Sequence, residues 1–84
     1  MIEAIDERMA TLAAQIATAA TRAVKKHPEN AGSIIELAMS GATALEFGRR
    51  LLIAYNDTEA AVFTSGMAEL VLNSLNGHLQ NEVH

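Results

Sequence analysis

SIIELAMSGATALEFGRRLLIAY, residues Ser33 to Tyr55, decides the fold of this 84-residue chain. Ser33 and Glu36 are spaced as a capping box, which predicts that a helix begins at Ser33. Apolar and small side chains then cover more than one side of this helix. One stripe contains Ile34, Ala38, Gly41, Leu45, Gly48, Leu52 and Tyr55, and a second contains Leu37, Ala44, Phe47 and Leu51. Because a helix that is apolar on most sides is buried on most sides, we expect 33–55 to be the central helix.

A second helix is predicted before it, at about residues 2–26. Its apolar residues recur at steps of three and four, the heptad pattern of a bundle or coiled coil: Ile2, Ile5, Met9, Leu12, Ile16, Ala19 and Ala23. The run from Met9 to Thr21 contains no charge. One interpretation is a second contact surface, for the third helix or another subunit, and the other is an alanine-rich surface that favours helix formation. We expect a self-association face formed by Ala10, Ala14, Ala17 and Thr21.

A third helix is predicted after the second of two turns. The first turn is HPENAG, residues 27–32, and the second is NDTE, where Asn56 or Asp57 can cap the next helix. This helix spans about 58–76 and leaves 77–84 as a tail, because Asn76-Gly77 is a plausible helical stop. Its predicted inner residues are Ala60, Phe63, Met67, Leu70, Val71 and Leu75. The prediction is an all-α fold: residues 1–84 form one domain, a small antiparallel three-helix bundle built from a helical hairpin plus a third helix.

Glycines inside the helices predict where the helices approach most closely. A glycine in a helix interior costs about 1 kcal/mol relative to alanine, and close approach of two backbones is a physical reason to accept that cost. If the first two helices fold back about residue 30, facing residue numbers add up to about 60, which places Gly48 opposite Leu12. Folding the third helix back about residue 57 places Gly66 opposite Phe47 and Gly48. We therefore expect close helix contacts at Gly41, Gly48 and Gly66.

Composition and net charge limit the classes of partner and the cellular compartment that we expect. The net charge is −4 and the pI is about 5.2, which argues against general affinity for nucleic acid or for an anionic membrane. The first residues are acidic, so we predict no signal peptide, and no stretch is long and apolar enough to span a membrane. We expect a soluble, cytoplasmic protein. A chain this small and without cysteine needs another source of stability, and oligomerisation is the leading candidate.

Residues that carry chemistry are sparse in the sequence. There is no glycine-rich phosphate loop, no nucleophile-elbow serine and no paired Glu-x-x-His segment of a di-iron bundle. We therefore predict that the protein is not an enzyme and uses no cofactor or metal. Arg49 and Arg50 are two charges on an otherwise apolar helix, so at least one should pair with an acid or a partner. Glu46 is the nearest local candidate.

Two functional hypotheses follow. The leading one is a non-enzymatic protein–protein interaction module, a homo-oligomer (a dimer as the first guess) that acts as an adaptor, chaperone or small inhibitor of another protein. The alternative is a module that binds a small anionic molecule, such as a nucleotide, between subunits. Its contacts would be Arg49, Arg50 and Tyr55, because arginine offers forked donors to phosphate and tyrosine can stack or form a hydrogen bond.

Overall fold

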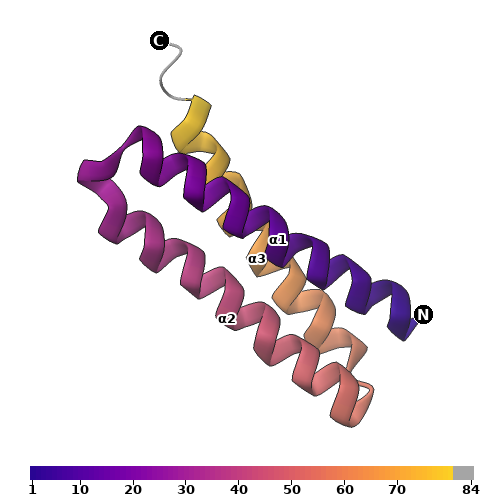
Figure 1. Ribbon diagram of the computed structural model, residues 1–84. Helices are drawn as coiled ribbons and strands as arrows, with labels where there is room; N and C mark the ends of the chain where they lie inside the picture. The colour runs from indigo at the N-terminus through magenta and orange to yellow at the C-terminus, as the bar shows by residue number, and fades with distance from the viewer. Residues whose placement is uncertain (81–84) are drawn as a thin grey trace.

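Three long helices make up the protein. The computed structural model describes residues 1–80, with the backbone alone at 78–80. The elements are α1 (Ile2–Lys26), a short 3₁₀ turn η1 (Pro28–Asn30), α2 (Ala31–Tyr55) and α3 (Thr58–Gln80). Successive helices run antiparallel and pack side by side, so the N-terminus lies at the same end as the α2–α3 connection (Figure 1). The described residues contain no strand, and the predicted all-α three-helix bundle is confirmed.

Two predicted helix ends are wrong. Helix α2 begins at Ala31, because η1 leads directly into its first turn, and Ser33 therefore lies inside the helix. The Ser33 hydroxyl donates to the Asn30 carbonyl oxygen, 3.3 Å away, and does not act as a capping acceptor. Helix α3 does not stop at Asn76-Gly77, since no glycine has a positive φ and the helix continues through Gln80. The remainder of the predicted tail, 81–84, lies outside the described residues.

The connection between α2 and α3 is a tight left-handed turn. Asn56 has φ 54° and ψ 32°, and its amide donates to the Leu52 carbonyl oxygen at 2.9 Å. Such a left-handed residue is a common way to satisfy the last carbonyl groups of a helix. Asp57 then caps α3, because its Oδ1 accepts a hydrogen bond of 3.0 Å from the Ala60 amide. The prediction that Asn56 or Asp57 caps the third helix is confirmed for Asp57.

The core is built from aliphatic and small side chains. Helix α1 buries the heptad residues Met9, Leu12, Ile16, Ala19 and Ala23, and α2 buries Ile34, Leu45 and Leu52. Helix α3 contributes the small residues Ala61, Ala68, Thr64 and Ser65 together with Leu75. All three aromatic side chains, those of Phe47, Tyr55 and Phe63, lie outside this core.

Gly41 and Gly48 lie where the helices pack most tightly. A Cβ atom on Gly48 would overlap the Thr64 side chain and lie 2.8 Å from Met9 Cε. A Cβ atom on Gly41 would lie 3.0 Å from both Ile16 Cδ1 and Val71 Cγ1. The residue numbers that face each other across α1 and α2 therefore add up to 57, not 60. The chain reverses within the short segment between the ends of α1 and α2, and this shifts the register by nearly one turn.

The third expected close helix contact, at Gly66, is wrong. Gly66 is exposed, and a Cβ atom added to it would meet no other atom within 4 Å. Thr64 occupies the position opposite Gly48 where Gly66 was expected. The reason is that α3 is rotated about its axis relative to the prediction, so that Ala61, Thr64 and Ala68 face inward.

This rotation exposes three of the large side chains of α3 that were expected inside, whereas Leu75 is buried as expected. Phe63, Met67 and Leu70 were expected inside and are exposed, and Phe47 on α2 is exposed as well. The expectation that α2 is buried on most sides is therefore wrong within this chain. Close packing at Gly48 leaves room only for the small Thr64 of α3, and this turns the stripe with Phe63 and Met67 outward. No helix among the described residues meets the length and hydropathy required to cross a bilayer.

Candidate protein-binding groove between α2 and α3

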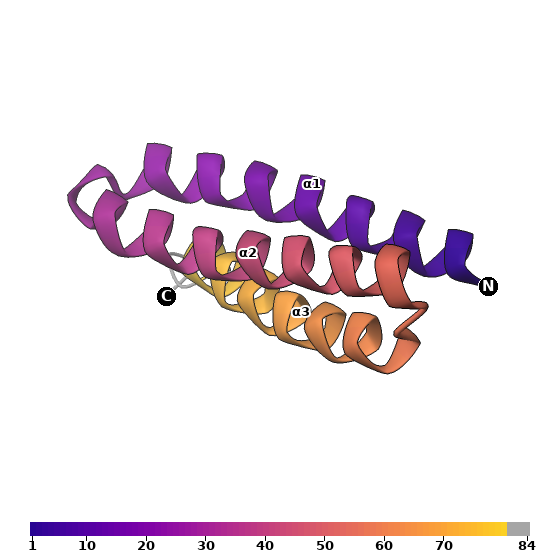
Figure 2. The same ribbon diagram turned by 90° about the horizontal axis from the view of Figure 1, so that it is seen from below.

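An open groove of about 780 Å³ runs between α2 and α3. Every residue that lines it belongs to these two helices, which lie side by side in both ribbon views (Figure 2). The large side chains along it are Met39, Phe47, Leu51, Phe63 and Met67. The smaller ones are Ser40, Thr43, Ala44, Ala60 and Thr64, and the single charged residue is Glu36.

The groove region exposes an unusual amount of apolar surface for so small a chain. The relevant residues and their exposed fractions are Phe47 59%, Phe63 69%, Met39 62%, Met67 46% and, beside them on α3, Leu70 68%. If a side chain of this size has a full accessible area of about 200 Å², these five present about 600 Å². The largest apolar patch on a typical monomer is about 300–600 Å² and is often functional. The surface around the groove therefore lies at the upper end of that range.

Two of the three hydroxyl groups that line the groove donate to carbonyl groups of their own helices. Thr64 Oγ1 donates to the Ala60 carbonyl oxygen at 2.9 Å, and Ser40 Oγ donates to the Leu37 carbonyl oxygen at 2.7 Å. Neither hydroxyl needs a polar partner from outside. The groove can therefore accept an apolar surface without leaving these donors unpaired, which is what an amphipathic helix requires of its binding site.

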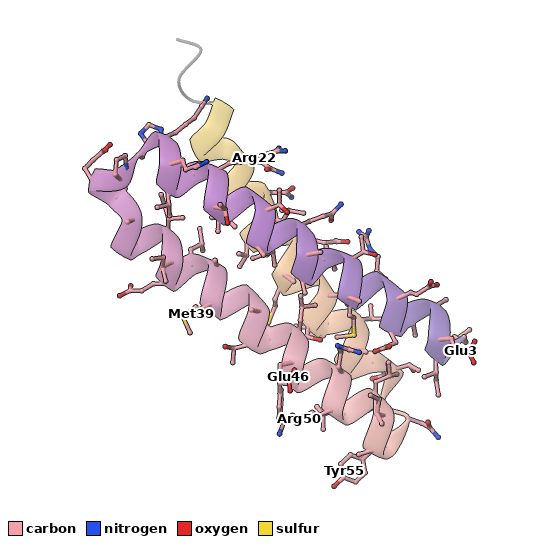
Figure 3. The ribbon with its side chains drawn as sticks, viewed as in Figure 1. Glu3, Arg22, Met39, Glu46, Arg50 and Tyr55 are labelled. Atoms are coloured by element: carbon pink, nitrogen blue, oxygen red, sulfur yellow. The ribbon has the colours of Figure 1, made fainter. Side chains whose placement is uncertain are left out.

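The three residues predicted to bind an anion are not brought together. Arg49 lies on the side of α2 next to α1 and forms a forked ion pair with Asp6, with Nε 2.7 Å from Oδ1 and Nη2 3.3 Å from Oδ2. Arg50 points away from α1 and pairs with Glu46, Nε to Oε1, at 2.9 Å (Figure 3). Tyr55 is 76% exposed at the end of α2. Each arginine is therefore already neutralised, on a different side of the helix.

Asp6 also affects the protonation of Arg49. The hydrogen bond to the Asp6 carboxylate, and then its negative charge, raise the pKa of Arg49 above the ordinary value for arginine. A group whose pKa is raised on folding contributes stability that is complete below its unfolded pKa. This contribution is lost only as the pH rises through the raised value. Arg49 itself should therefore add no pH dependence to stability between about pH 6 and about pH 9.

Arg49→Lys is expected to lower the free energy of unfolding by about 0.5–1 kcal/mol. Lysine cannot reproduce the forked contact with Asp6, but both side chains are partly exposed, at 40% and 35%, and water screens the pair. Arg50→Lys is the matched control and should cost about 0.3 kcal/mol or less, because that pair lies on the surface of one helix. Urea denaturation of both variants measures the difference. Equal losses would contradict a role for the Arg49–Asp6 pair in joining α1 to α2.

The predicted self-association face on α1 is exposed. Ala10, Ala14, Ala17 and Thr21 all lie at the surface, and the Thr21 hydroxyl donates to the Ala17 carbonyl oxygen at 2.8 Å. Their small side chains offer much less apolar area than the residues around the α2–α3 groove. Self-association through this face stays a prediction.

The groove is a site that the sequence reasoning missed, because its large side chains were assigned to the core. Among the described residues, no three potential metal ligands come together. Comparisons with protein-family models, with curated proteins and with solved structures found no match to this chain. The functional argument therefore depends on the geometry of the groove.

Proposed function

We propose that this protein is a non-enzymatic protein–protein interaction module, with the role of an adaptor, chaperone or small inhibitor. The surface that binds another polypeptide is the α2–α3 groove. The observation that carries this proposal is the outward placement of Phe47, Phe63 and Met67 along one groove with a single charged residue in its lining. Exposed apolar area of this size favours association, because burying it removes it from water.

The groove has the form expected of a helix-binding site. It lies between two antiparallel helices, and its floor consists of short side chains such as Ala44, Ala60 and Thr64. Bulky residues on both sides, Phe47 on α2 and Phe63 on α3, can pack around an inserted apolar stripe. In helix-in-groove recognition, an amphipathic helix lays its apolar face into a hydrophobic groove of this kind. The anionic-ligand hypothesis has no comparable support, because Arg49 and Arg50 are both held by acids of the same chain.

Photo-crosslinking in the cells that produce the protein tests the proposed function. Phe63 is replaced by benzoyl-phenylalanine, and Ile53 receives the same residue in a matched control. The two positions are 69% and 68% exposed, but only Phe63 lines the groove. We expect irradiation to give a covalent protein adduct at position 63 and much less at position 53. An equal yield at both positions, or no adduct at either, would mean that the groove binds no polypeptide.

A further inference from the structure

We propose that the occupant of this surface is a second copy of the chain, related by a twofold axis, with α3 packed antiparallel against α3 of that copy. This inference rests on the proposed function and names the partner. It starts from the outer stripe of α3, which we define as Phe63, Gly66, Met67, Leu70 and Ser74. Phe63, Met67, Leu70 and Ser74 recur at steps of four, three and four, and Gly66 lies beside Met67 on the same side. All five are exposed, so they form one face of the helix.

The charges on α3 favour an antiparallel arrangement. Between Thr58 and Gly77 the charged residues are Glu59 and Glu69, and Glu69 is paired with Arg8 on α1. A parallel pair of α3 helices would place the two copies of Glu59 beside each other. An antiparallel pair centred between Gly66 and Met67 places Glu59 opposite the uncharged Ser74 of the second copy. A twofold interface must be complementary to itself, and the antiparallel arrangement meets that condition without opposing like charges.

The sizes of the facing residues also support an antiparallel α3 pair centred between Gly66 and Met67. Antiparallel pairing about this point sets Phe63 opposite Leu70 of the second copy and Gly66 opposite Met67 of the second copy. Gly66 has no role in the packing of one chain, because it is exposed and has open space where its side chain would be. Glycine weakens a helix interior, so an exposed mid-helix glycine needs another reason. At the crossing point of two α3 helices, it would let the backbones approach and give room to Met67.

The available area reaches the lower end of the range that stable dimers bury. The five large apolar residues on this surface present about 600 Å² on each chain, before the small residues between them are counted. A standard protein–protein interface buries about 800 Å² on each partner. Two copies together present about 1,200 Å², the lower limit for a specific interface, when the second copy covers Met39 and Phe47 of α2 together with the outer stripe of α3.

Single-cysteine variants test the arrangement, because the chain contains no cysteine of its own. Met67→Cys places the thiol within one residue of the proposed axis, where two copies can reach disulfide distance. Ser74→Cys is the matched control on the same stripe. Its two copies would be about 22 Å apart along an antiparallel pair, at a rise of about 1.5 Å per residue. After mild oxidation of the purified protein, we expect most Met67→Cys chains as a disulfide-linked dimer and most Ser74→Cys chains as monomers under denaturing conditions.

Each other outcome overturns the proposal in a distinct way. Efficient linkage of both variants would indicate a parallel pair. Linkage of Ser74→Cys alone would indicate a different centre. If neither variant is linked, the second copy is not the occupant. Adducts of position 63 with a foreign protein in the photo-crosslinking experiment would then leave the proposed function standing. Loss of those adducts as well would overturn both.

Discussion

Leu52→Ala is expected to lower the free energy of unfolding by about 2–5 kcal/mol. Leu52 is fully buried in the core, so the smaller side chain loses transfer free energy and leaves a cavity. For a domain of this length the total stability is about 4–12 kcal/mol, which makes this a large fraction of it. Urea denaturation at a fixed protein concentration measures the loss, since any dimer would make the midpoint depend on concentration.

The adjacent residue provides the control for this experiment. Ile53 is 68% exposed, and Ile53→Ala should change stability by less than about 0.5 kcal/mol. Leu52 and Ile53 share the same helix and similar size, so the contrast isolates burial. Comparable losses from both substitutions would contradict the position of α2 in the bundle.

Gly48→Ala is expected to destabilise the protein by about 2 kcal/mol, although alanine is the better helix former. The new Cβ atom would overlap the Thr64 side chain, close to the α3 backbone, and crowd Met9 Cε at 2.8 Å. Overpacking of this kind typically costs about 1–3 kcal/mol or more, which exceeds the gain of about 1 kcal/mol in helix propensity. For a chain of this size the melting temperature should fall by roughly 8–16 °C. Thermal unfolding followed by circular dichroism measures this.

Two further variants make the prediction for Gly48 specific. Gly32→Ala, at an exposed glycine with open space around it, should be neutral or slightly stabilising. Combining Gly48→Ala with Thr64→Ala should recover part of the loss, because the second change removes the overlapping hydroxyl. A stabilised Gly48→Ala protein would show that α2 and α3 are farther apart than the structure has them.

The burial of α1 could be predicted from the sequence, and that of α3 could not. Helix α1 has one apolar stripe, from Met9 to Ala23, and that stripe is buried. Helix α3 has two competing stripes. The one with Phe63 and Met67 is more hydrophobic, but the one with Ala61 and Ala68 is buried.

Steric fit against α2, and not hydrophobicity, determines which of these two stripes of α3 is buried. Gly48 brings α2 close to α3, and only a small side chain, that of Thr64, fits opposite it. Gly41 and Gly48 in the sequence indicate this close approach of the helices. Ranking the faces of α3 by hydrophobicity does not take it into account.

The candidate site was missed for the same reason. Once Phe47, Phe63 and Met67 were assigned to the core, no apolar surface remained to suggest a groove. The partner of Arg49 was missed on different grounds, because Asp6 lies 43 positions away and only the register of α1 against α2 brings them together. Glu46 was correctly anticipated as a local partner of the two arginines, and it pairs with Arg50.

The central claim is that a second copy covers the α2–α3 surface, and the mass of the purified 84-residue chain in solution tests it most directly. Light scattering over a concentration series compares the unmodified protein with Phe63→Glu and with Ile53→Glu, two changes at equally exposed positions. We predict twice the 9.0 kDa chain mass for the unmodified protein and for Ile53→Glu, and a shift toward 9.0 kDa for Phe63→Glu. A mass of 9.0 kDa at every concentration, or a dimer that Phe63→Glu leaves intact, would contradict the claim.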